Sequence, residues 1–123
     1  MKNLILGVTA ACMLMPLMAS ADDTTCVSRG EAEAHIAAVS DAIVGTGFYG
    51  KRGKDQSGLI SKALAAKSYV TDHKYSDAIS KLDDIVTKVT NLLDAPKEKI
   101  DALGGELIVD TTIDAMYCVS DLQ

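Results

Sequence analysis

Apolar residues recur along most of the chain at the spacing of amphipathic helices. The clearest stretch runs from Tyr75 to Leu93, where apolar residues occupy positions i, i+3, i+4 and i+7 for about five turns. Charged residues fill the opposite face. Two pairs of opposite charge lie four residues apart there: Asp77 with Lys81, and Asp84 with Lys88. The pattern predicts a helix over 75–93, with Leu82 in the middle of its buried stripe and ion pairs on its solvent face.

Two further helices are predicted ahead of this one. Ser28-Arg29-Gly30-Glu31 matches a capping box, in which the Ser28 hydroxyl accepts a backbone hydrogen bond and Glu31 reaches back. Apolar residues then follow one helical stripe up to Gly45: Ala32, Ile36, Val39 and Ile43. The next helix is predicted over 57–71. Its expected inward residues are Ile60, Ala63, Leu64 and Val70.

The fourth helical segment is predicted to open at Pro96, because proline suits the first turn of a helix. Its inward candidates follow one helix face: Ile100, Leu103, Leu107, Ile108, Ala115, Val119 and Leu122. Gly104 and Gly105 interrupt this pattern, since two glycines inside a helix cost about 2 kcal/mol relative to alanine. Either the helix kinks or splits at the glycines, or its backbone packs closely against a neighbour.

These four helices define an all-α fold. No stretch alternates apolar and polar residues in the manner of a half-buried strand. The short links at 71–75 and 94–96 favour antiparallel neighbours, so we predict a single antiparallel up-down four-helix bundle. In that topology the start of the first helix and the end of the fourth share one end of the bundle, where Cys26 and Cys118 fall.

Residues 1–21 have the pattern of a secretory signal peptide. Lys2 is their one charged residue, a long apolar run follows, and Ala19-Ser20-Ala21 matches a signal-peptidase site. The run is shorter than the roughly 20 apolar residues of a membrane anchor. We therefore expect cleavage after Ala21, a mature helical domain over 22–123 without a membrane span, and a periplasmic or secreted bacterial protein. The alternative is a lipoprotein processed at Cys12.

Cleavage would leave Cys26 and Cys118 as an even pair in an oxidising compartment, which favours a disulfide between them. Such a bridge closes most of the mature chain into one loop, and loop-closure entropy then stabilises the fold by about 4 to 5 kcal/mol. The alternative is a pair of free thiols. Two cysteines this far apart without a histidine pair do not predict a metal site.

Composition narrows the class of protein. The 123 residues include 17 acidic and 12 basic side chains, for a formal charge of -5, and 4% are aromatic. Removal of residues 1–21 takes away Lys2 and makes the charge -6. An acidic chain without tryptophan lacks the clustered cations that neutralise phosphates, so no nucleic-acid partner is expected. Any core must be aliphatic.

The link at 45–58 is rich in glycine and carries the best candidate for a partner-binding surface. Its candidate residues are two aromatics and three cations: Phe48, Tyr49, Lys51, Arg52 and Lys54. Such a cluster fits an acidic protein or a polyanionic envelope polymer. The alternative is a solvated loop whose aromatics fold back onto the bundle. Its glycines match parts of two phosphate-binding motifs, but a helix precedes them where both motifs need a strand, so no nucleotide cofactor is expected.

Groups capable of catalysis or metal binding are few. His35 lies near the edge of the first apolar stripe, and His73 lies in the turn after the second helix beside Asp72. Neither has a second histidine at ligand spacing, and no serine or cysteine sits in a nucleophile motif. We therefore expect no catalytic residues, no metal and no cofactor, and for His73 a role at a helix end, where a positive charge is favourable.

Two stretches resemble the FIMAH-type helical domain of bacterial exported proteins. They are Gly58-Leu59-Ile60-Ser61-Lys62-Ala63-Leu64-Ala65-Ala66-Lys67 and Ala78-Ile79-Ser80-Lys81-Leu82-Asp83-Asp84-Ile85-Val86-Thr87-Lys88-Val89. The resemblance extends over residues 32–122. It implies a helical accessory or interaction module without catalytic residues.

Three functions from different classes remain open. The first is an exported helical module without catalytic activity that binds a protein or an envelope polymer. The second is a periplasmic immunity or inhibitor protein, whose acidic face would complement a basic toxin or hydrolase. The third is a carrier that holds a small ligand or a metal between its helices, as bundles can.

Overall fold

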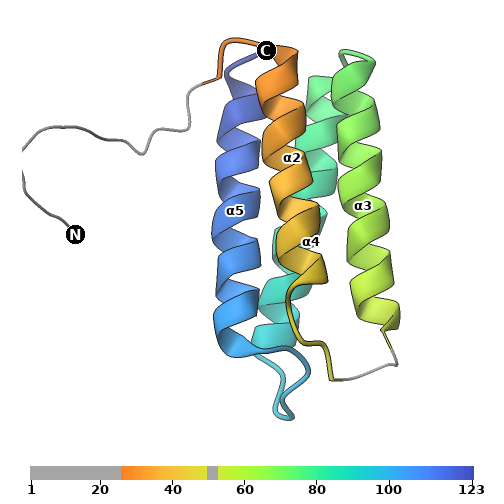
Figure 1. Cartoon of the computed structure of the whole chain (residues 1–123), viewed down its shortest axis with the longest axis vertical. Helices are drawn as coiled ribbons and strands as arrows, with labels where there is room; N and C mark the ends of the chain where they lie inside the picture. Colours follow the sequence, from red (N-terminus) through yellow and green to blue (C-terminus); the bar gives the residue numbers. More distant parts are fainter. Residues whose placement is uncertain (1–25, 50–52) are drawn as a thin grey trace, which may run out of the picture.

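The computed structural model describes residues 26–49 and 53–123, which form an antiparallel up-down four-helix bundle (Figure 1). The helices are α2 (Arg29–Val44), α3 (Lys54–Thr71), α4 (Tyr75–Leu93) and α5 (Ala102–Ser120). Both α2 and α4 pack against α3 and α5, so each helix has two neighbours. The predicted fold class and topology are confirmed. The predicted signal peptide lies outside the described residues.

The core is aliphatic, and every helix supplies one stripe to it. Fully buried side chains come from all four helices: Ile36, Val39, Ile43, Leu59, Val70, Leu82, Ile85, Val89, Ile108 and Val119. The hydroxyls of Thr46 and Thr112, which are also buried, donate to carbonyl oxygens four residues earlier at 2.7 and 2.6 Å. The stripe predicted for the first helix is confirmed in full. Among the described helices, none combines the length and apolarity needed to cross a lipid bilayer.

Helix α2 begins and ends as its sequence predicts. The capping box is present, because the Ser28 Oγ accepts from the Glu31 N–H at 3.2 Å and the Glu31 Oε1 accepts from the Ser28 N–H at 3.2 Å. Gly45 is the C-cap. The side-chain amide of Gln56 also donates to the Ile43 carbonyl at 2.9 Å, which accepts from the Thr46 N–H at 3.2 Å as well, so two hydrogen bonds meet at the helix end.

Helix α3 starts earlier than the predicted range 57–71 and buries a different leucine. It begins at Lys54, after Gly53, whose φ of 83° lies in the left-handed region that favours glycine. Its buried residues follow steps of three and four: Asp55, Leu59, Ala63, Ala66 and Val70. The inward position predicted for Leu64 was wrong, since this side chain is 58% exposed. Leu64 lies one residue, or about 100°, around the helix from the buried stripe.

Helix α5 begins at Ala102, so the prediction that Pro96 opens it was wrong. Asp101 is the N-cap, and its carboxylate accepts a hydrogen bond from the Gly104 N–H at 2.8 Å. The residues between Pro96 and this cap form a connecting segment instead of a helical turn. Two residues predicted to face inward are exposed: Leu103 at 79% and Leu107 at 56%.

The two glycines of α5 permit close packing and leave the helix continuous. A Cβ added at Gly104 would lie 2.6 Å from the side chain of Thr46, which follows α2. One added at Gly105 would lie 2.7 Å from a methyl group of Leu93, at the end of α4. Of the two alternatives that the sequence left open, close packing is confirmed.

Two ion pairs join α3 to α4. The Lys88 ammonium lies 3.2 Å from the Asp55 carboxylate, whose side chain is 9% exposed, and the Lys62 ammonium lies 3.8 Å from Asp84. The pair predicted within α4 between Asp84 and Lys88 was therefore wrong, because each residue has its partner on α3. Spacing along one helix predicts ion pairs within that helix, but it cannot predict a partner that a neighbouring helix supplies.

The predicted disulfide between Cys26 and Cys118 is confirmed. It joins the segment before α2 to the end of α5, with the two Cα atoms 4.9 Å apart. The Cys26 N–H also donates to the Asp121 carboxylate at 3.1 Å. A covalent bond and a hydrogen bond therefore hold together the two ends of the described domain.

Leu82→Ala is expected to lower the free energy of unfolding by about 2 to 5 kcal/mol, because it removes a fully buried side chain from the α4 stripe. Chemical denaturation measures the loss. Leu64→Ala is the matched control, and it should change the same free energy by less than about 0.5 kcal/mol because Leu64 is largely exposed. Equal losses for the two variants would contradict the described core.

Gly104→Ala is expected to destabilise the protein by about 1 to 3 kcal/mol, because the added methyl group overlaps the buried Thr46 side chain. Gly58→Ala, in α3, should instead stabilise it by about 0.4 to 1 kcal/mol, since nothing lies within 4 Å of the added carbon. Both changes are measured by denaturation. A stabilising Gly104→Ala would show that α5 does not approach the end of α2 this closely.

Replacing both Cys26 and Cys118 by serine should lower the free energy of unfolding by about 4 to 5 kcal/mol through the lost loop closure. Denaturant unfolding of the variant and the native protein gives the difference. In a parallel measurement by mass spectrometry, the native protein purified without reductant should take up no alkylating reagent until a reductant is added. Labelling without reductant would mean that the bridge is not formed.

Candidate functional site

The predicted partner-binding loop is only partly an exposed surface. Phe48 is half-buried and packs against the core, as the folded-back alternative expects. Tyr49 is 56% exposed, and Lys54 is exposed as the first residue of α3. The remaining two candidates lie outside the described residues: Lys51 and Arg52.

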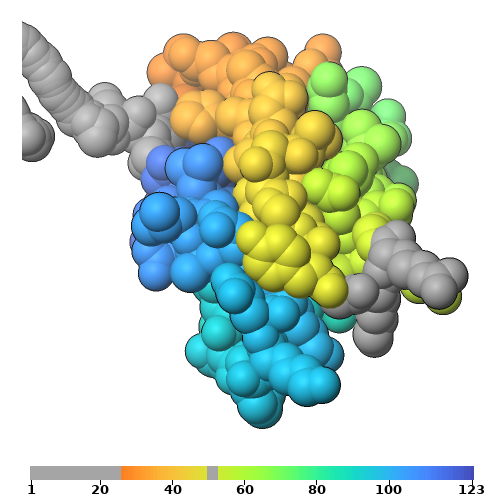
Figure 2. Space-filling view, turned by 60° about the horizontal axis from the view of Figure 1, so that its bottom comes forward, coloured from red at the N-terminus to blue at the C-terminus, as the bar shows by residue number. Residues whose placement is uncertain are grey.

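This loop forms backbone hydrogen bonds with the segment before α5, a contact that the sequence pattern does not predict. The Asp101 N–H donates to the Gly47 carbonyl at 2.8 Å, and the Tyr49 N–H donates to the Lys99 carbonyl at 2.9 Å. Figure 2 brings this end of the bundle forward, with the yellow 45–49 segment beside the blue start of α5. Lys99 therefore lies beside Tyr49, at the same end of the bundle as Lys54, and we call this the loop end.

A hollow between α3 and α4 has lysines on its walls. Its volume is about 300 Å³, and it is lined by Lys54, Asp55, Gly58, Leu59, Lys62 and Lys88. Two of the three lysines already pair with carboxylates, because Lys88 contacts Asp55 and Lys62 contacts Asp84. The internal ion pairs offset the positive charge that a polyanion would need.

Two largely apolar hollows lie between α4 and α5, and we call them together the α4–α5 groove. Its first hollow, of about 340 Å³, is lined by Asp83, Val86, Ile113, Met116 and Tyr117. The second, of about 230 Å³, is lined by Thr90, Leu93, Glu106, Val109 and Asp110. In each helix these residues recur at steps of one, three or four, so the two hollows follow each other along the same side of the helix pair.

The groove combines an apolar floor with acidic margins. Tyr117 is 61% exposed, so its ring is available to a partner, and Val86, Ile113 and Met116 are half-buried beside it. The charged lining residues are all carboxylates: Asp83, Glu106 and Asp110. No histidine, cysteine or serine lines either hollow. This chemistry suits binding of a cationic, partly apolar surface.

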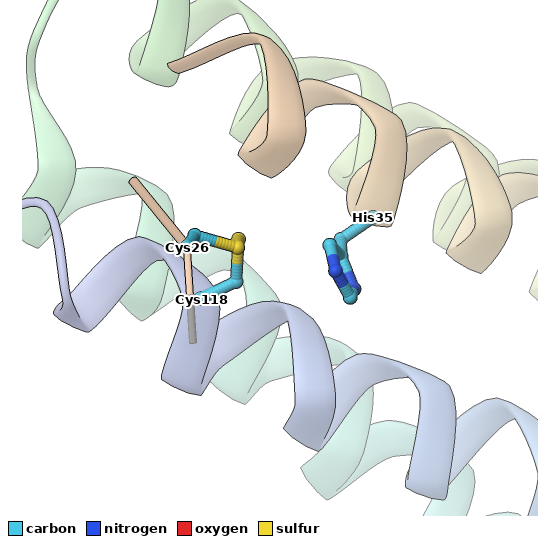
Figure 3. Close-up of side chains that lie close together, drawn as sticks. All are labelled: Cys26, His35 and Cys118. Carbon is cyan, nitrogen blue, oxygen red and sulfur yellow. A yellow bond between two sulfur atoms is a disulfide. The ribbon is translucent and has the colours of Figure 1, made fainter. Parts of the chain in front are cut away.

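A histidine lies beside the disulfide. The ligand atoms of Cys26, His35 and Cys118 all lie within 4.8 Å of one another. Figure 3 shows His35 reaching from α2 beside the two sulfur atoms. No linear motif signals this cluster, because its members come from the segment before α2, from α2 and from α5.

His73 ends helix α3, as its position in the sequence predicts. It has a φ of 63°, in the left-handed region, and the hydrogen bonds of a Schellman motif follow: His73 N–H to the Val70 carbonyl at 3.0 Å, and Lys74 N–H to the Tyr69 carbonyl at 2.7 Å. Its Nε2 accepts a hydrogen bond from the Arg29 guanidinium at 2.8 Å. In this contact the ring nitrogen is the acceptor, because an arginine guanidinium can only donate.

Fold and geometry together define a small, all-α, disulfide-linked four-helix bundle. No family model matches the chain, and no curated protein or solved structure is significantly similar to it. The resemblance to the FIMAH-type domain therefore rests on the residues of the two helical stretches and stays a prediction.

Proposed function

We propose that the chain is an exported helical interaction module without catalytic activity, which binds a partner protein through the α4–α5 groove. The observation that carries this proposal is the groove itself, where the exposed ring of Tyr117 and several half-buried apolar side chains lie among carboxylates. Apolar side chains that stay partly exposed and clustered on a small domain are typical of interaction sites. The groove lining holds no histidine, cysteine or serine, and so offers no nucleophile paired with an imidazole base, which supports a binding role.

The charge of the groove selects its occupant. Asp83, Glu106 and Asp110 lie along its margins without a lysine or arginine among the lining residues. A segment with lysine or arginine beside a short apolar face would place its cations on these carboxylates and its apolar side chains against Tyr117. The proposed partner is therefore a protein that presents a basic amphipathic segment.

The groove is a better candidate than the predicted loop. Phe48 packs against the core, and two of the three lysines that line the neighbouring α3–α4 hollow are paired with carboxylates. The loop therefore offers less apolar surface than its sequence suggests, and the hollow beside it offers less unpaired positive charge than its three lysines suggest. It serves in the experiment below as the competing site.

An acidic groove also fits a more specific function, that of an inhibitor or immunity protein. Its partner would be a basic toxin or hydrolase of the envelope, held through the same carboxylates. The disulfide supports export, because such bonds persist in oxidising compartments. Loss of the partner's activity in the complex would distinguish an inhibitor from an accessory module.

The test starts from capture of the partner with the mature oxidised protein from an envelope extract, followed by calorimetry with the purified partner. Replacing Asp83 and Asp110 together by lysine should weaken binding by about 10-fold or more, because it reverses the charge of the groove margins. The affinity of the native protein should fall as salt is raised.

Two controls make the result specific. Replacing Asp41 and Asp72 by lysine makes the same change in net charge at exposed positions away from the groove, and should alter the affinity by less than about 2-fold. Replacing Lys51, Arg52 and Lys54 together by alanine tests the loop. If the loop variant loses the partner and the groove variant keeps it, or if no partner is captured, the proposed site is wrong.

A further inference from the structure

The disulfide has a potential metal ligand beside it. His35, which is half-buried on α2, places a ring nitrogen within 4.8 Å of the sulfur atoms of both Cys26 and Cys118 (Figure 3). Among the described residues, none forms a hydrogen bond with the His35 ring. An imidazole and two sulfur atoms therefore converge on one point, with no described polar group competing for the ring.

In the disulfide the two sulfurs are bonded to each other and are not thiolates. A dithiol reductant would break this bond by exchange: two electrons and two protons pass to the protein, giving two thiols, and the reductant becomes a disulfide. Binding of a divalent ion would then release the two thiol protons, since thiolates are the ligands. Two thiolates and one imidazole form a donor set that suits zinc.

We propose that the reduced protein binds one Zn²⁺ through Cys26, Cys118 and His35, with water as the fourth ligand. Zinc–sulfur bonds of about 2.3 Å and zinc–nitrogen bonds of about 2.0 Å in a tetrahedron place the ligand atoms about 3.5 to 3.8 Å apart. The three ligand atoms already lie within 4.8 Å of one another, so shifts of an ångström or two build the site.

The positions of the ligands in the fold allow this shift. Cys118 and His35 lie on helices α5 and α2, which pack against each other and fix two of the three ligands. Cys26 precedes α2 and lies in no helix, so it is the ligand that can move when the sulfur–sulfur bond opens. His35 is half-buried while both cysteines are buried, which leaves the histidine side for the bound water.

The consequence is a site that has two exclusive states. The oxidised protein holds a disulfide and has no thiolate to bind zinc. The reduced protein holds the ion, which joins the segment before α2 to α5 in place of the covalent bond and also adds a link to α2. Zinc would therefore preserve the closure of the bundle end when the disulfide is absent.

The test uses the full mature domain, reduced and kept free of oxygen, with Co²⁺ as a spectroscopic substitute for Zn²⁺. One equivalent should produce thiolate-to-cobalt charge-transfer bands and the visible bands of a tetrahedral ion, and Zn²⁺ should remove both. The oxidised protein should produce neither. His35→Ala should weaken binding by about 10-fold or more, because a ligand is lost, whereas His73→Ala, the matched control, should leave it unchanged.

Circular dichroism of the same samples covers the case in which reduction unfolds the protein. One equivalent of Zn²⁺ should then restore the helical signal to the native chain and not to His35→Ala, since metal binding becomes part of the folding free energy. The proposal is wrong if the reduced native chain fails to bind, or if His35→Ala binds as tightly as the native protein.

Discussion

The structure depends on the burial of one narrow aliphatic stripe from each of four helices. The fully buried side chains of the described residues include no aromatic ring, and the aromatic residues that touch the core are only half-buried at its edge. The helices must therefore approach closely to reach native packing density. Gly104 and Gly105 allow that approach at the loop end. The disulfide closes the opposite end. With both ends fixed, the sides of the bundle can differ. Ion pairs join α3 to α4, whereas an apolar groove with acidic lining residues runs along the surface of the packed α4–α5 pair.

The sequence predicts the helices best where one face is plainly apolar and the other plainly charged, as around Leu82. It fails where two adjacent residues are both apolar, because periodicity then cannot tell which one faces inward. Leu64 follows a buried alanine and Leu107 precedes a buried isoleucine, and both are exposed. The prediction from Pro96 was wrong because proline is common both at helix starts and in loops. The start of α5 is instead set by the capping side chain of Asp101.

Candidate sites were harder to predict than the fold, because their residues come together only through packing. The groove combines residues of α4 with residues of α5 that run in the opposite direction. His35 reaches the two cysteines only because α2 packs against α5. The 45–58 loop was predicted to be a binding surface because its aromatic and basic residues stand out in the sequence. In the structure Phe48 packs against the core and is not fully available to a partner. A linear pattern records which groups are present, and the helix contacts decide which of them remain available.

The central claim is that the α4–α5 groove recognises a basic amphipathic segment. The most direct measurement follows the backbone amide signals of the oxidised protein by NMR while a helical peptide of lysine and leucine is added. The account predicts saturable shifts of the protein signals centred on Val86, Ile113 and Tyr117. Addition of a peptide whose lysines are replaced by glutamate should shift the same signals little. Shifts centred on Tyr49 and Lys54, or equal shifts with both peptides, would contradict it.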